Sequence, residues 1–136
     1  MSAKTFDDQI FLCGAPIEDH RKSDQGDSET FWQYVPNGGS YGVPYGTIVP
    51  KASENTWVVG RCFSATHDAH ASCRSMAQTM SMGQAAGLAA IISLEKDQNA
   101  KNINFNKLQH ALIQVGAILE MPKKIADISR NGWNNN

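Results

Sequence analysis

Residues 55–92 constrain the fold of this chain more than any other segment, and they read NTWVVGRCFSATHDAHASCRSMAQTMSMGQAAGLAAII. The apolar run WVV at residues 57–59 predicts a short strand that breaks at Gly60. A polar loop with two His and two Cys follows, and then a long helix rich in Ala and Gly. Free N–H groups at a helix start carry partial positive charge, so this order of elements favours binding of an anionic or electron-rich ligand.

Length and charge narrow the class of protein. The 136 residues suit one domain with its own core. A net charge of −1 and the lack of a basic, aromatic-rich cluster argue against a nucleic-acid partner or an acidic membrane surface. Three cysteines without framework spacing indicate a reduced, intracellular protein, which we expect in the cytoplasm. The first residues, MSAKTFDDQ, do not resemble a signal peptide.

One segment raises the question of a membrane helix. Residues 76–94 are largely apolar and contain the G-x-x-x-G spacing that membrane helices also use. Polar side chains interrupt the segment at Gln78, Thr79, Ser81 and Gln84. We therefore predict a helix buried in protein and no membrane span.

The first half of the chain predicts short extended segments joined by loops. Residues 9–12 suit a short strand, whereas residues 14–37 lack periodicity and predict a loop. Residues 41–49 predict an extended segment. Pro44 confines it to a sheet edge or a bulge, because proline cannot donate a backbone hydrogen bond.

The second half predicts two helices. The first begins near Ser75, whose spacing from Gln78 matches a capping box, and it runs to about residues 94–95. The second spans about residues 105–115, with Asn104 as its N-cap and Gly116 after its end. Together these elements predict an α/β or α+β fold with two main helices and a small sheet. Small residues share one side of the first helix and leave room for another backbone or a flat ligand: Gly83, Ala86, Gly87 and Ala90.

The same region resembles a known family. Its members read roughly N-L-L-V-A-G-R-C-I-S-A-T-H, then an Arg, then P-x-C-M-A-L-G-Q-A-A-G. The matching residues here are Val58, Gly60, Arg61, Cys62, Ser64, Ala65, Thr66, His67, Arg74, Met80, Gly83, Gln84, Ala85, Ala86 and Gly87. This pattern resembles the C-terminal segment of FAD-dependent oxidoreductases, in the fumarate reductase/succinate dehydrogenase flavoprotein-like group. The resemblance covers about residues 10–119, which correspond to the last part of a full family member.

The resemblance implies a domain organisation. Residues 1–136 would form a single C-terminal portion of such an oxidoreductase, with part of a Rossmann-like FAD-binding domain. Residues 1–40 would be an irregular segment that covers the flavin, and residues 41–119 would hold the FAD-contacting strand, loop and helix with the following helix. Residues 120–136 would be a tail. The phosphate-binding pattern G-x-G-x-x-G does not occur in these residues, and the family carries it far upstream.

The resemblance also implies a cofactor and site residues. FAD is the expected cofactor, and in the complete enzyme hydride would pass between a small-molecule substrate and flavin N5. The implied catalytic residues are His67, which would act near the ring, and Arg74, which would add positive charge. The implied cofactor-binding residues follow the strand end, the loop and the helix start: Gly60, Arg61, Ser64, Ala65, Thr66, His67, Ser75, Met76 and Ala77.

A chain with only this part of the site has consequences for its partners. We expect the isolated chain to bind FAD weakly or not at all. We also expect an N-terminal partner chain or self-association, because the apolar faces of residues 57–59 and of the first helix would lack neighbours. The identity of the substrate stays open.

Two further segments resemble parts of the family. Residues 14–20 resemble a stretch reading Y-P-I-D-I-H-D, in which the acid–His pair Asp19-His20 could transfer a proton. Residues 41–51 resemble Y-x-I-P-Y-R-x-L-V-P-K, with Gly46 where many members have Arg. If that Arg binds substrate or flavin in the family, this chain lacks the contact.

Two other classes of protein remain as alternatives. One is a non-catalytic remnant or interaction module that pairs with a partner chain. The other is a small zinc protein, since Cys62, His67, His70 and Cys73 supply four zinc-type ligands within twelve residues. The spacing lacks a C-x-x-C pair, and all four ligands would come from one short loop, so we predict no metal site.

Overall fold

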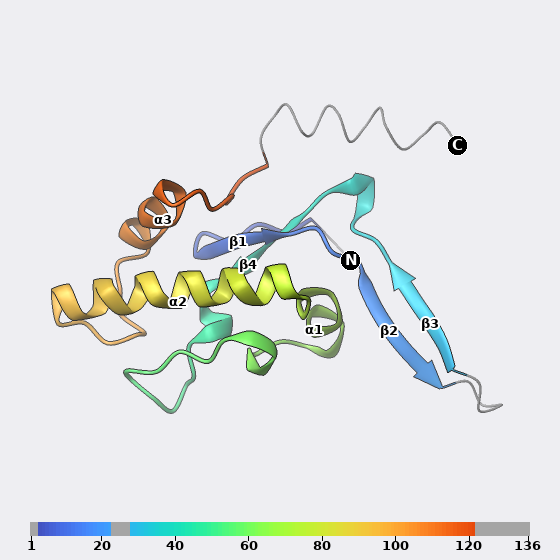
Figure 1. The fold of residues 1–136 in the computed structure, drawn as a ribbon, viewed down its shortest axis with the longest axis horizontal. Coiled ribbons are helices and arrows are strands. Elements are labelled where there is room, and N and C mark those ends of the chain that lie inside the picture. Colours follow the sequence, from blue (N-terminus) through green and yellow to red (C-terminus); the bar gives the residue numbers. More distant parts are fainter. Residues whose placement is uncertain (1–2, 23–27, 122–136) are drawn as a thin grey trace.

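The fold is α+β, as predicted, and the computed structural model describes residues 3–22 and 28–121 (Figure 1). Two separate two-stranded antiparallel sheets precede a group of helices in this part of the chain. The strands are β1 (Gln9–Cys13), β2 (Ile17–Lys22), β3 (Ser28–Gln33) and β4 (Tyr41–Pro44). The α-helices are α1 (His67–Cys73), α2 (Met76–Lys96) and α3 (Phe105–Gln114), and the short 3₁₀ turns are η1 (Pro36–Gly38), η2 (Tyr45–Ile48) and η3 (Gly60–Cys62).

The sheet of β1 and β4 confirms the strand predicted at residues 9–12 and the first part of the extended segment predicted at residues 41–49. Residues 45–48 form the 3₁₀ turn η2 instead of extended chain. Phe11 pairs with Val43, and Cys13 pairs with Tyr41. Pro44 ends β4, after which the chain turns into η2, as expected from a residue without a backbone N–H. This sheet supplies one side of the core.

The loop predicted for residues 14–37 is wrong, because β2 and β3 form an antiparallel hairpin there. Pairing runs from Ile17 opposite Gln33 to Lys22 opposite Ser28. Charged residues fill most of β2, so its sequence lacks the alternation of a half-buried strand. Figure 1 shows this hairpin extending away from α2 and α3. The irregular structure expected over residues 1–40 is therefore also wrong, whereas their position over a flavin stays a prediction.

The strand predicted at residues 57–59 does not form. Val58 N–H donates to Ile48 O at 2.8 Å, but no ladder of such bonds develops in the described part of the chain. Trp57 turns its indole toward the core instead, and its Nε1–H donates to the Tyr45 hydroxyl at 2.6 Å. Tyr45 is itself 2% exposed. An extended segment without a neighbouring strand therefore packs through its aromatic side chain.

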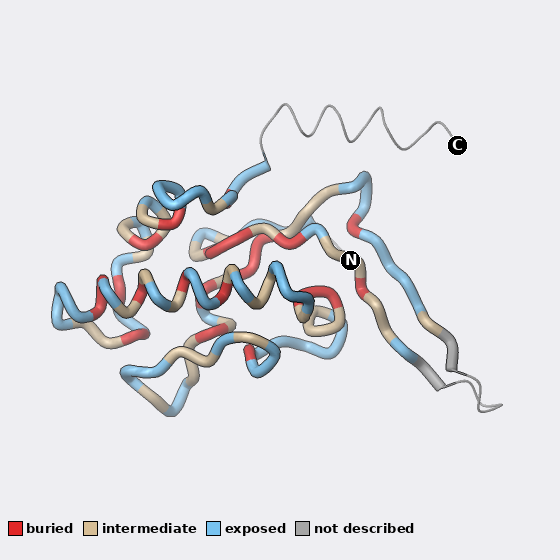
Figure 2. The backbone as a smooth tube through the Cα atoms, viewed as in Figure 1, coloured by how far each residue is buried: buried red, intermediate tan, exposed pale blue. Residues whose placement is uncertain are grey.

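Helix α2 packs one face on the sheet and leaves the opposite face exposed. Met82, Ala85, Ala89 and Ile92 repeat at helical spacing and are buried with β1 and β4, and α3 adds Leu108 and Leu112 to the same core. Figure 2 shows buried positions along one side of α2 and exposed positions along the other. We call the exposed side the outer face of α2; it comprises Met76, Met80, Gly83, Gly87, Ile91 and Leu94.

The two long helices begin differently. Asn104 caps α3 as predicted, since its Oδ1 accepts from Lys107 N–H at 3.0 Å, and Gly116 follows the helix end with φ of 90°. Ser75 is the N-cap residue of α2, but the predicted capping box does not form. The Ser75 hydroxyl donates to the Gln78 side-chain oxygen, so it satisfies no backbone N–H group.

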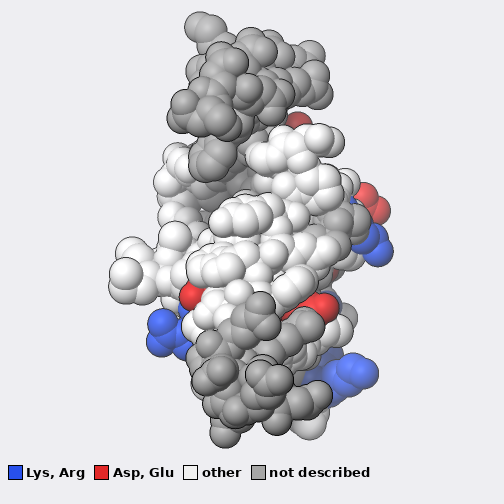
Figure 3. Space-filling model, turned by 90° about the vertical axis from the view of Figure 1, so that its right-hand side faces the viewer, with Lys and Arg blue, Asp and Glu red and all other residues white. Residues whose placement is uncertain are grey.

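No helix of the described residues combines the length and the hydropathy needed to cross a bilayer. The predicted tail, residues 120–136, lies outside the described residues from position 122 onward. Figure 3 shows acidic and basic side chains scattered among uncharged ones on the face that it draws.

Candidate functional site

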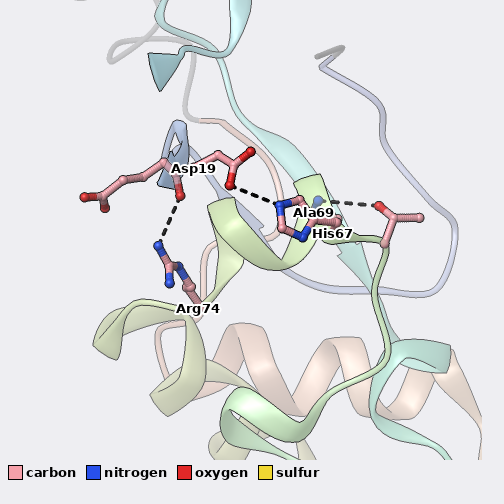
Figure 4. A network of polar contacts seen from close by, with 6 residues as sticks. Asp19, His67, Ala69 and Arg74 are labelled. Atoms are coloured by element: carbon pink, nitrogen blue, oxygen red, sulfur yellow. Dashed lines mark hydrogen bonds and ion pairs between the residues drawn. The ribbon is translucent and has the colours of Figure 1, made fainter. Parts of the chain in front are cut away.

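The segment predicted as a polar loop is helical, because Thr66 starts α1. The Thr66 Oγ1 accepts from Ala69 N–H at 3.4 Å, and Asp68 places a negative charge in the first turn, where the helix dipole favours it. Helix α1 lies beside β2, and only two residues separate the end of α1 from the start of α2 (Figure 4). The candidate site therefore comprises η3, α1, the start of α2 and the adjacent strand β2.

His67, the first residue of α1, is held by an acid from the hairpin. Its Nε2 lies 3.1 Å from Asp19 Oδ1 on β2 (Figure 4). The His67 side chain is 77% exposed, whereas the Asp19 side chain is 13% exposed. A largely buried carboxylate thus orients an imidazole that solvent and ligands can reach.

The predicted pairing of Asp19 with His20 is wrong. Neighbouring residues of a strand point to opposite faces, so β2 directs these two side chains apart. His20 lies instead beside Glu18, at 3.6 Å, and its Nδ1 is 3.1 Å from the Thr30 hydroxyl. Asp19 is therefore a site residue whose partner, His67, could not be predicted from the sequence.

Hydrogen bonds of two arginines connect η3, α1 and β2. Arg74 Nη2 donates to the carbonyl of Glu18 on β2 at 3.1 Å (Figure 4). Arg61 Nε donates to the Arg74 carbonyl at 3.1 Å, and the Arg61 carbonyl lies 2.9 Å from His70 Nε2. These bonds fix η3 against α1 and fix the end of α1 against β2. Both guanidinium groups keep further N–H donors beyond these contacts.

The backbone at η3 is open on one side. Gly60 has φ of 76°, a conformation that other residues rarely adopt, and a Cβ at this position would meet no atom within 4 Å. Ser64 N–H donates to Thr47 O at 2.8 Å, which anchors the following turn. The side chains of Ser64, Ala65 and Thr66 are exposed. A ligand could therefore approach the chain closely from Gly60 to Thr66.

The start of α2 offers free donors. Ser75, Met76 and Ala77 are exposed, and no side chain of the described residues caps their N–H groups. Such groups carry the positive end of the helix dipole. Exposed N–H donors, an open glycine turn and an accessible imidazole suit a flat, electron-rich cofactor, so the donor set of this chain fits the FAD that its sequence implies.

The zinc hypothesis finds no support. Cys73 is 2% exposed, while His67 contacts Asp19 and His70 contacts the Arg61 carbonyl. In residues 3–22 and 28–121, no three His, Cys, Asp or Glu side chains gather in a way that could hold a metal ion. The helical course of α1 separates ligands that were expected on one loop.

A groove elsewhere on the molecule contains none of the predicted site residues. It is open, has a volume of about 1010 Å³, and lies between the N-terminal segment and α3, with Phe6, Gln109 and Leu119 in its walls. The predicted residues lie instead on the exposed surface of η3, α1 and α2. Burial of a cofactor on that surface would need further chain beyond the described residues.

Comparison with known proteins gives one finding. A family model described as FAD dependent oxidoreductase matches residues 1–112. The matched range includes every residue of the candidate site. Searches of curated proteins and of solved structures gave no match.

Proposed function

The chain belongs to the family of FAD-dependent oxidoreductases, and from this premise we propose that residues 41–119 form the part of its site that contacts the flavin ring and the ribityl chain. One observation carries the proposal. The open turn at Gly60, the exposed His67 and the uncapped start of α2 lie on neighbouring elements joined by Arg61 and Arg74. Each of them exposes a group that a flavin could contact.

The flavin supplies the hydride chemistry through N5, and the protein supplies position and charge. In this proposal the N–H groups of Met76 and Ala77 donate to the electron-rich edge of the ring. The backbone from Gly60 to Thr66 lies along the ribityl chain. Arg74 adds positive charge beside the helix start, while its bond to Glu18 holds that charge in place.

His67 moves a proton between the substrate and solvent in this proposal. Its exposed ring can reach a bound molecule, and Asp19 orients it. Asp19 is a positioning residue, because it acts through the imidazole.

We further propose that the chain is the C-terminal portion of a larger enzyme of the fumarate reductase/succinate dehydrogenase flavoprotein-like group. The outer face of α2 supports this, because Met76, Met80 and Leu94 are 75%, 73% and 83% exposed. Gly83 and Gly87 on the same face have open space where a side chain would be. An N-terminal portion, in the same chain or in a partner, would cover this face and hold the pyrophosphate of FAD.

A comparison of two ligands tests the proposal. The chain contacts the ring and the ribityl group but not the pyrophosphate, so it should bind riboflavin and FAD with similar, weak affinity. In a titration followed by amide NMR signals, both ligands should shift the signals of Gly60, Met76 and Ala77. His67→Ala should weaken both interactions, whereas His110→Ala, an exposed histidine of α3, should weaken neither.

Other outcomes of the titration would contradict the proposal. Tight FAD binding with no response to riboflavin would place the pyrophosphate, not the ring, on this chain. Shifts confined to the groove beside α3 would place the ligand at another site.

A further inference from the structure

One buried hydroxyl group, that of Ser72, joins three separate segments of the chain. Ser72 lies in the last turn of α1 and is 2% exposed. Its Oγ accepts from the Tyr41 hydroxyl on β4 at 2.7 Å. The same Oγ donates to the carbonyl of Ala15, in the connection between β1 and β2, at 2.7 Å. Residues from three distant parts of the sequence therefore meet at one oxygen atom.

The direction of these hydrogen bonds follows from the groups that make them. A backbone carbonyl can only accept, so the single hydroxyl proton of Ser72 is committed to Ala15. The Tyr41 hydroxyl therefore donates its own proton to Ser72 Oγ. Cys13 Sγ lies 3.9 Å from Ser72 Oγ and adds at most a weak S–H donor. Movement of any of the three segments would leave a buried polar group without a partner, which is costly.

The two partners of Ser72 belong to different parts of the fold. Tyr41 is a strand residue of the sheet of β1 and β4, which supplies one side of the core. Ala15 lies two residues before β2 begins. Ser72 thus connects the core sheet both to α1 and to the start of β2, which are the elements that carry His67 and Asp19.

The hairpin of β2 and β3 depends on such contacts because it extends away from α2 and α3 (Figure 1). Arg74 donates to the carbonyl of Glu18 at 3.1 Å, and His67 Nε2 lies 3.1 Å from Asp19 Oδ1 (Figure 4). Ser72 is more buried than Arg74 and His67. Water therefore competes least with the bond that Ser72 makes to the connection before the hairpin.

We propose that Ser72 is a positioning residue of the candidate site, which sets the distance between His67 and Asp19 from the other end of α1. It touches neither flavin nor substrate, and its importance for the reaction rests on the proposed function. Loss of the hydroxyl would remove the bond that α1 shares with the start of β2, so the hairpin would move relative to His67. The imidazole would stay exposed but would lose its fixed carboxylate partner.

The imidazole signals of His67 test the proposal by NMR in the chain without a ligand. The proton and carbon chemical shifts in Asp19→Ala define the state in which the contact is lost. Ser72→Ala should move the His67 signals toward that state, and it should have no effect on them in the Asp19→Ala background. The matched control is Ser93→Ala, because Ser93 is 9% exposed and its hydroxyl also donates to a carbonyl, that of Gln98. This control should leave the His67 signals in place.

Tyr41→Phe gives a second readout, since it removes one bond of Ser72 and keeps the bond to Ala15. It should move the His67 signals in the same direction by a smaller amount. The proposal is overturned if folded Ser72→Ala keeps the signals of the unchanged chain, if Ser93→Ala moves them equally, or if the effect persists without Asp19. If Ser72→Ala does not fold, Tyr41→Phe decides, and unmoved signals then overturn the proposal. Failure of riboflavin to bind would contradict the proposed function but would leave these ligand-free signals unchanged.

Discussion

At the scale of single residues, the contact between Gln9 and Gly42 determines how β1 and β4 fit together. Gln9 is 6% exposed; its side chain donates to Leu119 O, and its Oε1 accepts from Phe6 N–H at 3.1 Å. A Cβ at Gly42 would lie 1.9 Å from that Oε1 and 3.1 Å from Gln9 Cβ. Gly42→Ala should therefore break both bonds and lower the free energy of unfolding by about 1–3 kcal/mol.

Urea denaturation of Gly42→Ala measures this loss, and Gly46→Ala is its matched control. Gly46 lies just beyond β4, and a Cβ there would meet no atom within 4 Å. The control should change the free energy of unfolding by less than about 0.5 kcal/mol. Equal effects of the two substitutions would show that the Gln9 contact is unimportant.

The buried cysteines predict how stability depends on pH. The pKa of Cys13 is lowered from 9.0 to about 6, so between these values the unfolded state holds one more proton and stability rises with pH. The pKa of Cys73 is raised, so above pH 9 the folded state holds the extra proton and stability falls. The slope for one proton is at most about 1.4 kcal/mol per pH unit.

Urea denaturation between pH 6 and pH 9 under reducing conditions measures this slope. Cys13→Ala should remove it, whereas Cys62→Ala, at an exposed cysteine, should retain it. A slope that survives the loss of Cys13 would assign the titration to another group.

At the scale of elements, the two helix starts should respond differently to loss of their N-cap side chains. Asn104 bonds to Lys107 N–H, so Asn104→Ala should lower the free energy of unfolding by about 1 kcal/mol. Ser75 bonds to a side chain and not to the backbone, so Ser75→Ala should change it by less than about 0.5 kcal/mol. Thermal or urea unfolding of both variants measures the difference, and a larger loss at Ser75 would contradict it.

Sequence patterns predicted the elements whose signals are local. Hydrophobic periodicity, together with the Gly, Pro and capping residues at the ends of elements, identified β1, β4, α2 and α3. Each of these elements buries a regular set of its own residues. The charged residues of β2 give no strand-like alternation, so the strand was not predicted. The N-cap residue Thr66 lies within a run of polar residues, so the helix α1 was not predicted either. Residues 57–59 were wrongly predicted as a strand, since a strand depends on a neighbour that the pattern cannot show.

Some features of the candidate site likewise follow from local sequence, whereas others depend on the tertiary fold. The turn at Gly60 and the helix start at Ser75 follow from adjacent residues, and both were expected. The contact between Asp19 and His67 joins residues 48 positions apart, and no local spacing specifies it. Their pairing depends on α1 lying beside β2, which is a property of the tertiary fold.

At the scale of the whole molecule, the outer face of α2 should make the isolated chain associate with itself. A face with several large exposed apolar side chains favours contact with another apolar surface. Light scattering over a range of concentrations should show a growing fraction of dimers. The double variant Met80→Asp, Leu94→Asp should reduce it, whereas Gln114→Asp, at an exposed position of α3, should not. A chain that stays monomeric at every concentration would contradict this expectation.

The short connection between α1 and α2 has a mechanical consequence. Arg74 and Ser75 alone separate the two helices, so one helix can hardly move without the other. A rotation of α2 that follows contact with another surface would turn α1 as well, and would change the angle between the imidazole of His67 and its carboxylate. Contact of the outer face of α2 with another surface and the orientation of His67 would then be linked through two residues.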